Sequence, residues 1–339
     1  MQLSDFDFPF DPNLVASQPI IPRDRARLLV LARQTGRLEH HHVFDLPHLL
    51  DPGDLLVVND TKVLEARLSG RKRPAGTPVE VLFVREHGSD TWEVMIKGTL
   101  RVGQVIEFDH GSHATIIKRD AGGTRMRVSS PVSVRELLRQ QGSMPLPPYI
   151  KRAPTEEDRR WYQTLFARHE GAIAAPTAGL HFTEELLEQL GRAAIGTATV
   201  TLHVGPGTFR PVTTTRIEDH LMEEEQFAVG ADTMEAIRET KKMGRRVVAV
   251  STTVVRTLET VANDQSGIPS ASGKSRLFIT PGFRFRAIDA LFTNFHLPRT
   301  SLLMLVSAFA GVEFVREAYE EAVRKRYRFY SYGDAMLIL

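Results

Sequence analysis

The chain has 339 residues, of which 42% are hydrophobic and 25% charged, and its formal net charge is +2. This composition excludes a disordered chain and a polycation, and it is typical of two folded domains or of one domain that carries an insertion. The chain has no cysteine, which excludes disulfides, thiolate metal ligands and a cysteine nucleophile and suits a reducing cytoplasm.

We expect neither a targeting segment nor a membrane span. The start of the chain, MQLSDFDFPFDP, carries acids where a secretion signal would carry basic residues. The most apolar stretch, SLLMLVSAFAG at 301–311, is shorter than the ~20 residues that a bilayer span needs, so it predicts a buried helix. The sequence therefore predicts a cytoplasmic protein without a membrane partner.

The first 150 residues combine α/β and all-β patterns. RLLVLAR (27–33) and LLVVN (55–59) are short apolar runs that predict buried strands. From about residue 65 the pattern changes to short alternating segments broken by Gly and Asp, which predict a small antiparallel β-barrel. These segments are PVEVLFV, TWEVMIKG, QVIEFDHG, HATIIKRD and TRMRVSS. A short helix, SVRELLRQQG, and a proline-stiffened extended segment, PLPPYI, follow.

After residue 155 helical and strand patterns alternate again. Helices are predicted in EEDRRWYQTLFARH, TEELLEQLGR, ADTMEAIRETKKMG and VVRTLETVAN, and strands in GAIAAP, TATVTLHV and RRVVAVSTT. Thr183 and Asp232 are the expected N-caps, and Gly244 the residue just past a helix end. Residues 263–275 are expected to form a polar loop. We therefore predict an α/β main domain, residues 1–64 and 151–339, interrupted by an inserted small antiparallel β-barrel domain at 65–150.

Five polar clusters follow predicted strands: NDTK (59–62), PTAGLHFT (176–183), LHVGPGTFRP (202–211), STTVVRT (251–257) and TNFHLPRTS (293–301). Ligands bind beyond the carboxyl ends of the strands in parallel α/β sheets, so the clusters predict one binding site. Its candidate residues are Asn59, Asp60, Lys62, Thr177, Gly179, Gly205, Gly207, Thr208, Arg210, Thr252, Thr253, Arg256 and Asn294.

Two of these clusters have a simpler interpretation as well. Backbone N–H groups at a helix start behind Thr252 and Thr253 can hold a carboxylate or phosphate, but the threonines can equally be plain N-caps. GPGTFRP lacks the third glycine and the downstream acid of a dinucleotide fingerprint, so a Rossmann cofactor is not expected. A tight loop that presents Thr208 and Arg210 remains open.

Three histidines, His181, His203 and His296, each lie at an apolar strand end. Histidine titrates near neutrality and suits acid–base catalysis, although a buried, hydrogen-bonded histidine is the ordinary alternative for each. Three imidazoles can ligate zinc, but these are widely spaced and no HxH or HExxH pair is present, so no metal is expected. The absence of G-x-S-x-G argues against a Ser–His–Asp hydrolase.

Basic and aromatic residues interleave in VRKRYRFYSYG (323–333). Cationic side chains bind phosphates and aromatic faces stack on unpaired bases, so this pattern is typical of proteins that bind single-stranded or loop RNA. The alternative, which we favour, is a solvated helix end whose aromatic side chains belong to the core.

Taken in order, the polar clusters and their neighbours resemble one family along the whole chain, that of the S-adenosylmethionine:tRNA ribosyltransferase-isomerases of queuosine biosynthesis. The segments that carry the resemblance are RDRARLLVL, GDLLVVNDTKVLEARLSG, PLPPYI, YQTLFA, GAIAAPTAGLHFT, TLHVGPGTFRPV, STTVVRTLET, DALFTNFHLPRTSLLMLVSAFAG and YRFYSYGDAMLI. The sequence departs from the family pattern, as in Ser251, where glycine is usual, and at Glu65, Glu223, Val254 and Thr280.

The resemblance implies a fold and a reaction. The fold is an α/β domain with an inserted β-barrel. The reaction moves the ribosyl part of S-adenosylmethionine onto 7-aminomethyl-7-deazaguanine at the wobble position of tRNA and isomerises it, giving epoxyqueuosine and releasing adenine and methionine. S-adenosylmethionine is then a co-substrate, no permanently bound cofactor is expected, and the partner is a tRNA anticodon stem-loop. We expect a monomer.

With this reaction the candidate residues take provisional roles. The expected catalytic residues are His181, His203, His296 and Asp334, with the assignment of base and acid left open among the histidines. Thr252, Thr253 and Arg256 are expected to hold the methionyl carboxylate. Asn59, Asp60 and Lys62 are expected at the ribose hydroxyls or the aminomethyl group, a role open to Asp334 too. A charge-free strand end around His181 suits a sulfonium substrate, which a strong cationic field would repel.

Other classes of protein stay open on the sequence alone. One is a non-catalytic RNA-binding protein whose barrel and basic patches hold a stem-loop. Another is a metal-dependent hydrolase that uses the three histidines. The last is a methyltransferase, against which the missing glycine-rich fingerprint argues.

Overall fold

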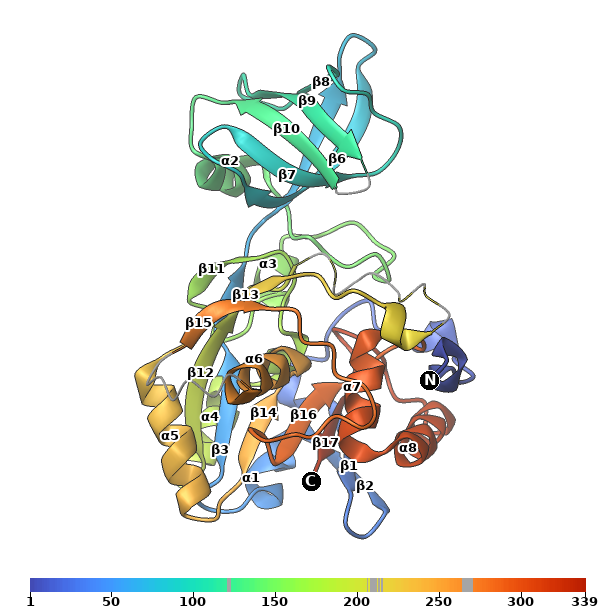
Figure 1. The fold of residues 1–339 in the computed structure, drawn as a ribbon, viewed down its shortest axis with the longest axis vertical. Helices are drawn as coiled ribbons and strands as arrows, with labels where there is room; N and C mark the ends of the chain where they lie inside the picture. The colour runs from blue at the N-terminus through green and yellow to red at the C-terminus, as the bar shows by residue number, and fades with distance from the viewer. Residues whose placement is uncertain (121–122, 206, 208–211, 213, 215, 264–270) are drawn as a thin grey trace.

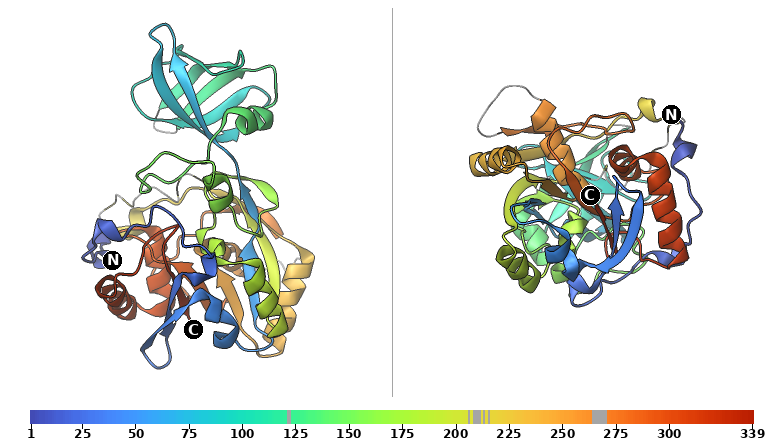
Figure 2. Two further views of the ribbon diagram at one scale, coloured as in Figure 1. Left: turned by 180° about the vertical axis from the view of Figure 1, so that it is seen from behind. Right: turned by 90° about the horizontal axis from the view of Figure 1, so that it is seen from below.

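The structure is a computed structural model, which describes residues 1–120, 123–205, 207, 212, 214, 216–263 and 271–339. Two bodies lie along its long axis, a closed barrel at one end and an α/β domain with both chain termini at the other (Figures 1 and 2). The predicted fold class, an α/β main domain with an inserted small antiparallel β-barrel, is confirmed.

The α/β domain is built on a nine-stranded mixed sheet. Its strand order is β15 (Ala271–Ser275), β13 (Glu225–Val229), β12 (Gly196–Leu202), β3 (Leu55–Asn59), β14 (Val247–Val250), β16 (Ala290–Asn294), β17 (Ala335–Ile338), β1 (Arg27–Ala32) and β2 (Arg37–His42). The four central strands β12, β3, β14 and β16 run parallel, so their carboxyl ends meet at one edge of the sheet.

Helices cover both faces of this sheet. Side chains of α1 (Leu46–Leu49) and α4 (Glu184–Arg192) pack on one face, and those of α5 (Ala231–Lys242), α6 (Thr252–Asn263), α7 (Ser301–Ala310) and α8 (Val312–Arg324) pack on the other. Successive residues of a strand point to opposite faces, so Leu55 and Val57 join one core while Leu56 and Val58 join the other. This is why the LLVVN segment is apolar along the four positions before its terminal asparagine.

The barrel closes in the order β10 (Gly123–Ser129), β7 (Thr91–Ile96), β6 (Thr77–Glu86), β5 (Arg67–Lys72), β8 (Val105–Glu107) and β9 (His113–Asp120). Helix α2 (Val134–Gln141) packs Leu137 and Leu138 against its core. The chain enters and leaves the barrel side by side, because Arg67 and Ser143 exchange backbone hydrogen bonds of 3.2 and 2.9 Å. A Cβ on Gly142 would lie 1.9 Å from the carbonyl oxygen of Glu65, so this crossing requires glycine.

A small parallel pair, β4 (Thr61–Val63) and β11 (His169–Ala172), lies at the end of the α/β domain that faces the barrel (Figure 1). The helix predicted over EEDRRWYQTLFARH is wrong apart from α3 (Asp158–Trp161). The Gln163 side chain accepts from the Val63 amide at 3.1 Å and donates to its carbonyl at 2.7 Å. This pairing holds the chain beside β4 and ends the helix.

Three further expectations need correction. GAIAAP is a strand only through Ala172. Helix α5 begins at Ala231 with Gly230 as N-cap, so Asp232 lies in the first turn, where its charge favours the helix dipole. Residues 271–275 form the edge strand β15, because its backbone pairs with β13 along its whole length.

Other local predictions are confirmed. The Thr183 side chain accepts from the Leu186 amide at 3.1 Å as an N-cap. Gly244 has φ +68° just past the end of α5. The apolar segment 301–311 contains the buried helix α7. No helix among the residues that the structure describes is long and apolar enough to cross a bilayer.

Asp158 offers a test of how the chain that follows the barrel is held. Its carboxylate is fully buried and accepts from the Arg152 guanidinium at 2.6 and 2.7 Å, from the Thr155 amide at 2.8 Å and from the Tyr332 hydroxyl at 2.9 Å. Burial alone would raise its pKa, but the Arg152 and Thr155 hydrogen bonds outweigh it, and the pKa is lowered. We expect Asp158→Asn to lower the free energy of unfolding by about 2–4 kcal/mol in urea titrations at pH 7.

The pH dependence has a definite sign. A carboxyl whose pKa is lowered by folding stabilises the protein above its unfolded pKa, about 3.9, and this contribution is lost as the pH falls through the folded pKa. The difference in free energy of unfolding between the wild type and Asp158→Asn should therefore become smaller below about pH 4. The control is Glu188→Gln, which removes an exposed ion pair with Arg192 and should change little. A difference in free energy of unfolding that stays constant down to about pH 2 would contradict this account.

Candidate active site

A cavity of about 360 Å³ opens where the carboxyl ends of β14 and β16 meet the start of α6. Among the described residues its wall contains no Asp, Glu, Lys or Arg. The wall consists of Pro148, Tyr149, Ala175, Pro176, Thr177, Ala178, Val204, Ser251, Thr252, Thr253, Thr293, Asn294, His296, Leu297, Pro298, Thr300, Leu302, Tyr330 and Ser331. Three of the five predicted clusters meet here, together with Val204 of a fourth.

The fifth cluster, NDTK, lies behind this cavity and braces it. Asn59 is buried, and its carboxamide oxygen accepts from the amides of Thr61 and Leu202, both at 3.1 Å. Its nitrogen donates to the Leu202 carbonyl at 3.0 Å and to the Thr253 hydroxyl at 3.1 Å. Asn59 therefore joins the ends of β3 and β12 to the first turn of α6, and no part of its amide is left for a ribose hydroxyl.

Asp60 and Lys62 also have partners in the protein. Asp60 accepts from the Thr201 hydroxyl at 2.6 Å and is buried, and Lys62 donates to Glu170 at 3.2 Å. Neither residue lines the 360 Å³ cavity. Thr61, between them, contacts the His203 ring, so the side chains of residues 59–61 all bond to residues within 201–203.

The three histidines occupy different places. His296 lines the cavity, and its Nε2 lies 2.9 Å from the Thr293 hydroxyl. His181 lies behind Asn294, whose Nδ2 donates to His181 Nε2 at 3.0 Å while its Oδ1 accepts from Thr177 at 2.9 Å. Burial lowers the pKa of both rings to about 3, so both are neutral at physiological pH. His203 faces a second, larger cavity.

Two predicted charged residues serve the fold at positions outside the cavity wall. Arg256 is buried and forms an ion pair with Glu225, so it does not extend to a carboxylate in the cavity. Asp334 is fully buried and accepts from the backbone amides of Arg27 at 3.0 Å and Arg328 at 2.7 Å, and it pairs with the Arg27 guanidinium. Neither side chain lines either large cavity.

The described glycines of the predicted site lie in different places. Gly205 lines the larger cavity. Gly179 packs against Thr164, since a Cβ at residue 179 would lie 3.0 Å from the threonine methyl. Gly207 lies against the Glu223 side chain. Thr208 and Arg210 lie outside the described residues.

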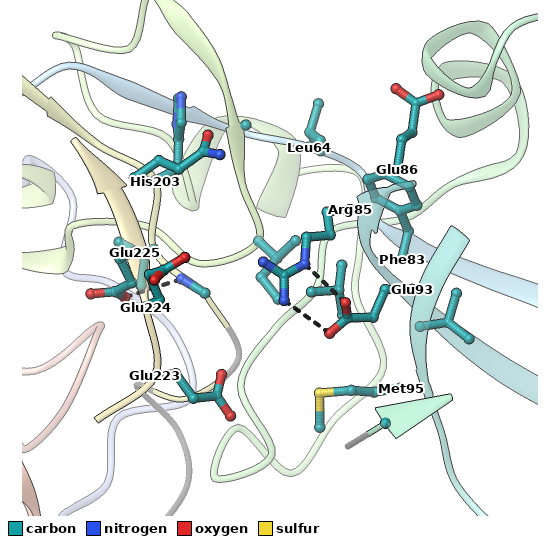
Figure 3. A pocket seen from close by; sticks show the side chains of 18 of the residues that line it. Leu64, Phe83, Arg85, Glu86, Glu93, Met95, His203, Glu223, Glu224 and Glu225 are labelled. Atoms are coloured by element: carbon teal, nitrogen blue, oxygen red, sulfur yellow. Dashed lines mark hydrogen bonds and ion pairs between the residues drawn. The ribbon is translucent and has the colours of Figure 1, made fainter. Parts of the chain in front are cut away.

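The larger cavity, of about 950 Å³, is a cleft between the barrel and the α/β domain. Arg85 and Glu93 face it from the barrel, paired at 2.9 and 3.3 Å, and Glu223, Glu224 and Glu225 face it from the α/β domain (Figure 3). Its lining carries both signs of charge. The cationic side chains are Arg85, Arg119, Arg135, Lys274 and Arg276, and the acidic ones are Glu86, Glu93, Asp120, Glu170, Glu223, Glu224 and Glu225. Val204 lines both the cleft and the uncharged cavity, so the two adjoin.

Sequence reasoning missed the aromatic wall of the uncharged cavity. Tyr149, from PLPPYI, stacks on Tyr330 with ring centroids 3.9 Å apart, and its hydroxyl lies 2.6 Å from that of Ser331. The signal was present, because a tyrosine after two prolines is rigidly presented. In the segment 323–333, by contrast, Tyr327, Phe329 and Tyr332 are buried, as the core interpretation predicts.

Nowhere among the described residues do three or more His, Asp or Glu side chains gather so as to hold a metal ion. An uncharged cavity lies at the carboxyl edge of the α/β sheet, where enzymes of this fold class bind their small ligands, and a charged cleft under the β-barrel adjoins it.

Comparisons with known proteins give the particular family. Residues 3–338 match the model of the family described as queuosine biosynthesis protein. S-adenosylmethionine:tRNA ribosyltransferase-isomerases of Moorella thermoacetica and Desulforamulus reducens are 51% and 47% identical over the full length of both chains. The crystal structure of an S-adenosylmethionine tRNA ribosyltransferase from Thermotoga maritima is similar with a TM-score of 0.59 at 39% identity, covering 99% of this chain and 100% of that one. The chain belongs to the queuosine biosynthesis protein family.

Ser251 provides a test of strain at the cavity wall. It has φ +94°, a left-handed conformation that glycine tolerates and other residues adopt at a cost. Its hydroxyl accepts from the Val254 amide at 3.4 Å and lies 2.5 Å from the Thr253 hydroxyl. We expect Ser251→Gly to be more stable than Ser251→Ala by about 1 kcal/mol in urea unfolding, because both lose the hydroxyl and only glycine relieves the strain. Equal stability of the two variants would show that the backbone is not strained.

Proposed function

We propose that this chain is an S-adenosylmethionine:tRNA ribosyltransferase-isomerase. It transfers and isomerises the ribosyl part of S-adenosylmethionine onto 7-aminomethyl-7-deazaguanine at the tRNA wobble position, gives epoxyqueuosine and releases adenine and methionine. The observation that carries the proposal is the junction of an uncharged cavity and a charged cleft at Val204. The two substrates, a small sulfonium cation and an RNA polyanion, have opposite electrostatic requirements.

S-adenosylmethionine occupies the uncharged cavity in this proposal. The first-turn N–H groups of α6 at Thr252 and Thr253 hold its carboxylate, since a helix N-terminus attracts an anion. Thr177, Asn294 and His296 supply neutral hydrogen-bonding groups around the rest of the molecule. S-adenosylmethionine acts as a co-substrate, and no permanently bound cofactor takes part.

The anticodon stem-loop lies along the interdomain cleft. Cationic side chains from the barrel and from the α/β domain line it together, and Arg135 of α2 reaches Glu170 of β11 at 3.3 Å, which links the two bodies across it. We place the domain boundaries at residues 65 and 150, supported by the paired entry and exit at Arg67 and Ser143. We propose a cytoplasmic enzyme that works as a monomer, as the sequence predicts.

A turnover assay tests the function directly. The protein is mixed with S-adenosylmethionine and an anticodon stem-loop that carries 7-aminomethyl-7-deazaguanine, and the products are measured by mass spectrometry. We expect adenine and methionine in equal amounts, matched by a mass gain on the RNA. RNA binding without adenine release would indicate a non-catalytic RNA-binding protein. Transfer of a labelled methyl group from S-adenosylmethionine to the RNA would indicate a methyltransferase.

A second prediction tests the uncharged cavity. Leu302 lines its wall and is partly exposed, and lysine and methionine are of similar length. We expect Leu302→Lys to raise KM for S-adenosylmethionine about tenfold or more, because an ammonium a few ångströms from a sulfonium repels it by ~1–3 kcal/mol. Leu302→Met, the matched control, should change KM little. The lysine effect should shrink in high salt. Equal KM values for the two variants would show that charge in this cavity is unimportant.

A further inference from the structure

His203 is held in a fixed orientation by two neighbours. Its Nδ1 lies 2.8 Å from the Thr61 hydroxyl, and its backbone amide donates to the Gln226 carbonyl at 3.0 Å. On the other side, a Cβ on Gly171 would lie 2.7 Å from both Nδ1 and Cε1 of the ring. The slot therefore admits the imidazole only because residue 171 has no side chain.

The other ring nitrogen of His203 has no hydrogen-bond partner among residues 1–120, 123–205 and the later described segments. When Nδ1–H donates to Thr61, Nε2 keeps its lone pair and can accept a proton. The ring is half-buried and lines the cleft on the α/β side, across from Arg85 and Glu93 (Figure 3). An oriented imidazole with one open nitrogen is the arrangement that general bases use.

The other two histidines are less suited to this task. His181 Nε2 accepts from Asn294, and His296 Nε2 lies against Thr293. Both rings are buried, 4% and 8% exposed, so a proton taken up there would be a poorly solvated charge. His203 has a route to solvent through the cleft.

Resting on the proposed function, we infer that His203 is the base that prepares the aminomethyl group of the tRNA for attack, with Thr61 and Gly171 as its positioning residues. The aminomethyl group is an ammonium ion at neutral pH and has no lone pair. His203 Nε2 takes one of its protons, and the N–H electron pair stays on the nitrogen and then forms the bond to the ribosyl carbon. Over the same reaction the bonds from the ribosyl group to the adenine nitrogen and to the sulfonium sulfur break, so adenine and methionine leave. The imidazolium passes its proton to water in the cleft. Val204, the next residue, lines the cavity where the ribosyl donor lies.

The charged groups around His203 set the pH range of this step. Asp60 and Lys62 lie on or beside β4, His169 and Glu170 on β11, and Glu223, Glu224 and Glu225 at or just before the start of β13. Burial lowers the His203 pKa, His169 lowers it further and Asp60 opposes both. The ring is therefore neutral at physiological pH, the state that a base requires, and the rate of the wild type should fall on the acid side as His203 is protonated.

The test compares single-turnover adenine release by the wild type with that of four variants. His203→Gln and His203→Ala should lose about 100-fold in rate and lose the acidic limb of the pH profile, and added imidazole should restore part of the His203→Ala rate. Thr61→Val should slow the reaction, whereas Thr61→Ser, which keeps the hydroxyl, should not. Equilibrium binding of S-adenosylmethionine should be the same in all, because these side chains lie outside its cavity.

His169→Gln is the matched control on the neighbouring strand. Its side chain is largely exposed, so the plateau rate should persist, while loss of its field should move the acidic limb to higher pH. If the wild type releases adenine and His203→Ala keeps the rate and the acidic limb, the role of His203 is wrong and the proposed function stands. If the wild type releases no adenine, the proposed function itself is wrong.

Discussion

The site depends on the buried side-chain amide of Asn59. Its two acceptor and two donor positions are all used, and they tie three separate segments, the ends of β3 and β12 and the start of α6, at one point. An aspartate at residue 59 would lack the two donors, and a leucine would lack donors and acceptors alike. Each buried polar group left without a partner would lower the stability of the fold by about 1–3 kcal/mol. The orientation of His203 and the position of Thr253 at the cavity wall both follow from this junction.

Charge is distributed between the two cavities by the elements that build them. The uncharged cavity is formed by strand ends and helix starts. There, backbone groups and hydroxyls, which carry no formal charge, are available to bind a ligand. The cleft is formed by solvent-facing strands of the barrel and by β13 and β15, whose outward side chains are free to be charged. In the proposed function, the sulfonium and the polyanion therefore have separate electrostatic environments within one chain.

The sequence predicts the fold well because its strands are strongly patterned, as in the fully buried β3 and the alternating barrel strands. It also predicts that Thr177, Thr252, Asn294 and His296 belong together. The sequence could not predict that four polar residues bond within the protein, because a polar residue near a strand end can either face a ligand or bond to its neighbours. These residues are Asn59, Asp60, Arg256 and Asp334. Only the three-dimensional hydrogen bonds separate these cases. The helix predicted before residue 169 failed for the same reason, since the Gln163 contact with Val63 spans 100 residues.

The stacked pair of Tyr149 and Tyr330 has a consequence for the autonomy of the two bodies. Tyr149 belongs to the segment by which the chain returns from the barrel, and Tyr330 to the segment that leads into the last strand, β17. Both form the wall of the cavity assigned to the small substrate. The α/β portion therefore does not complete this cavity wall by itself. The segment that returns from the barrel supplies part of the wall, so a change in the angle between the two bodies would also change the shape of this cavity.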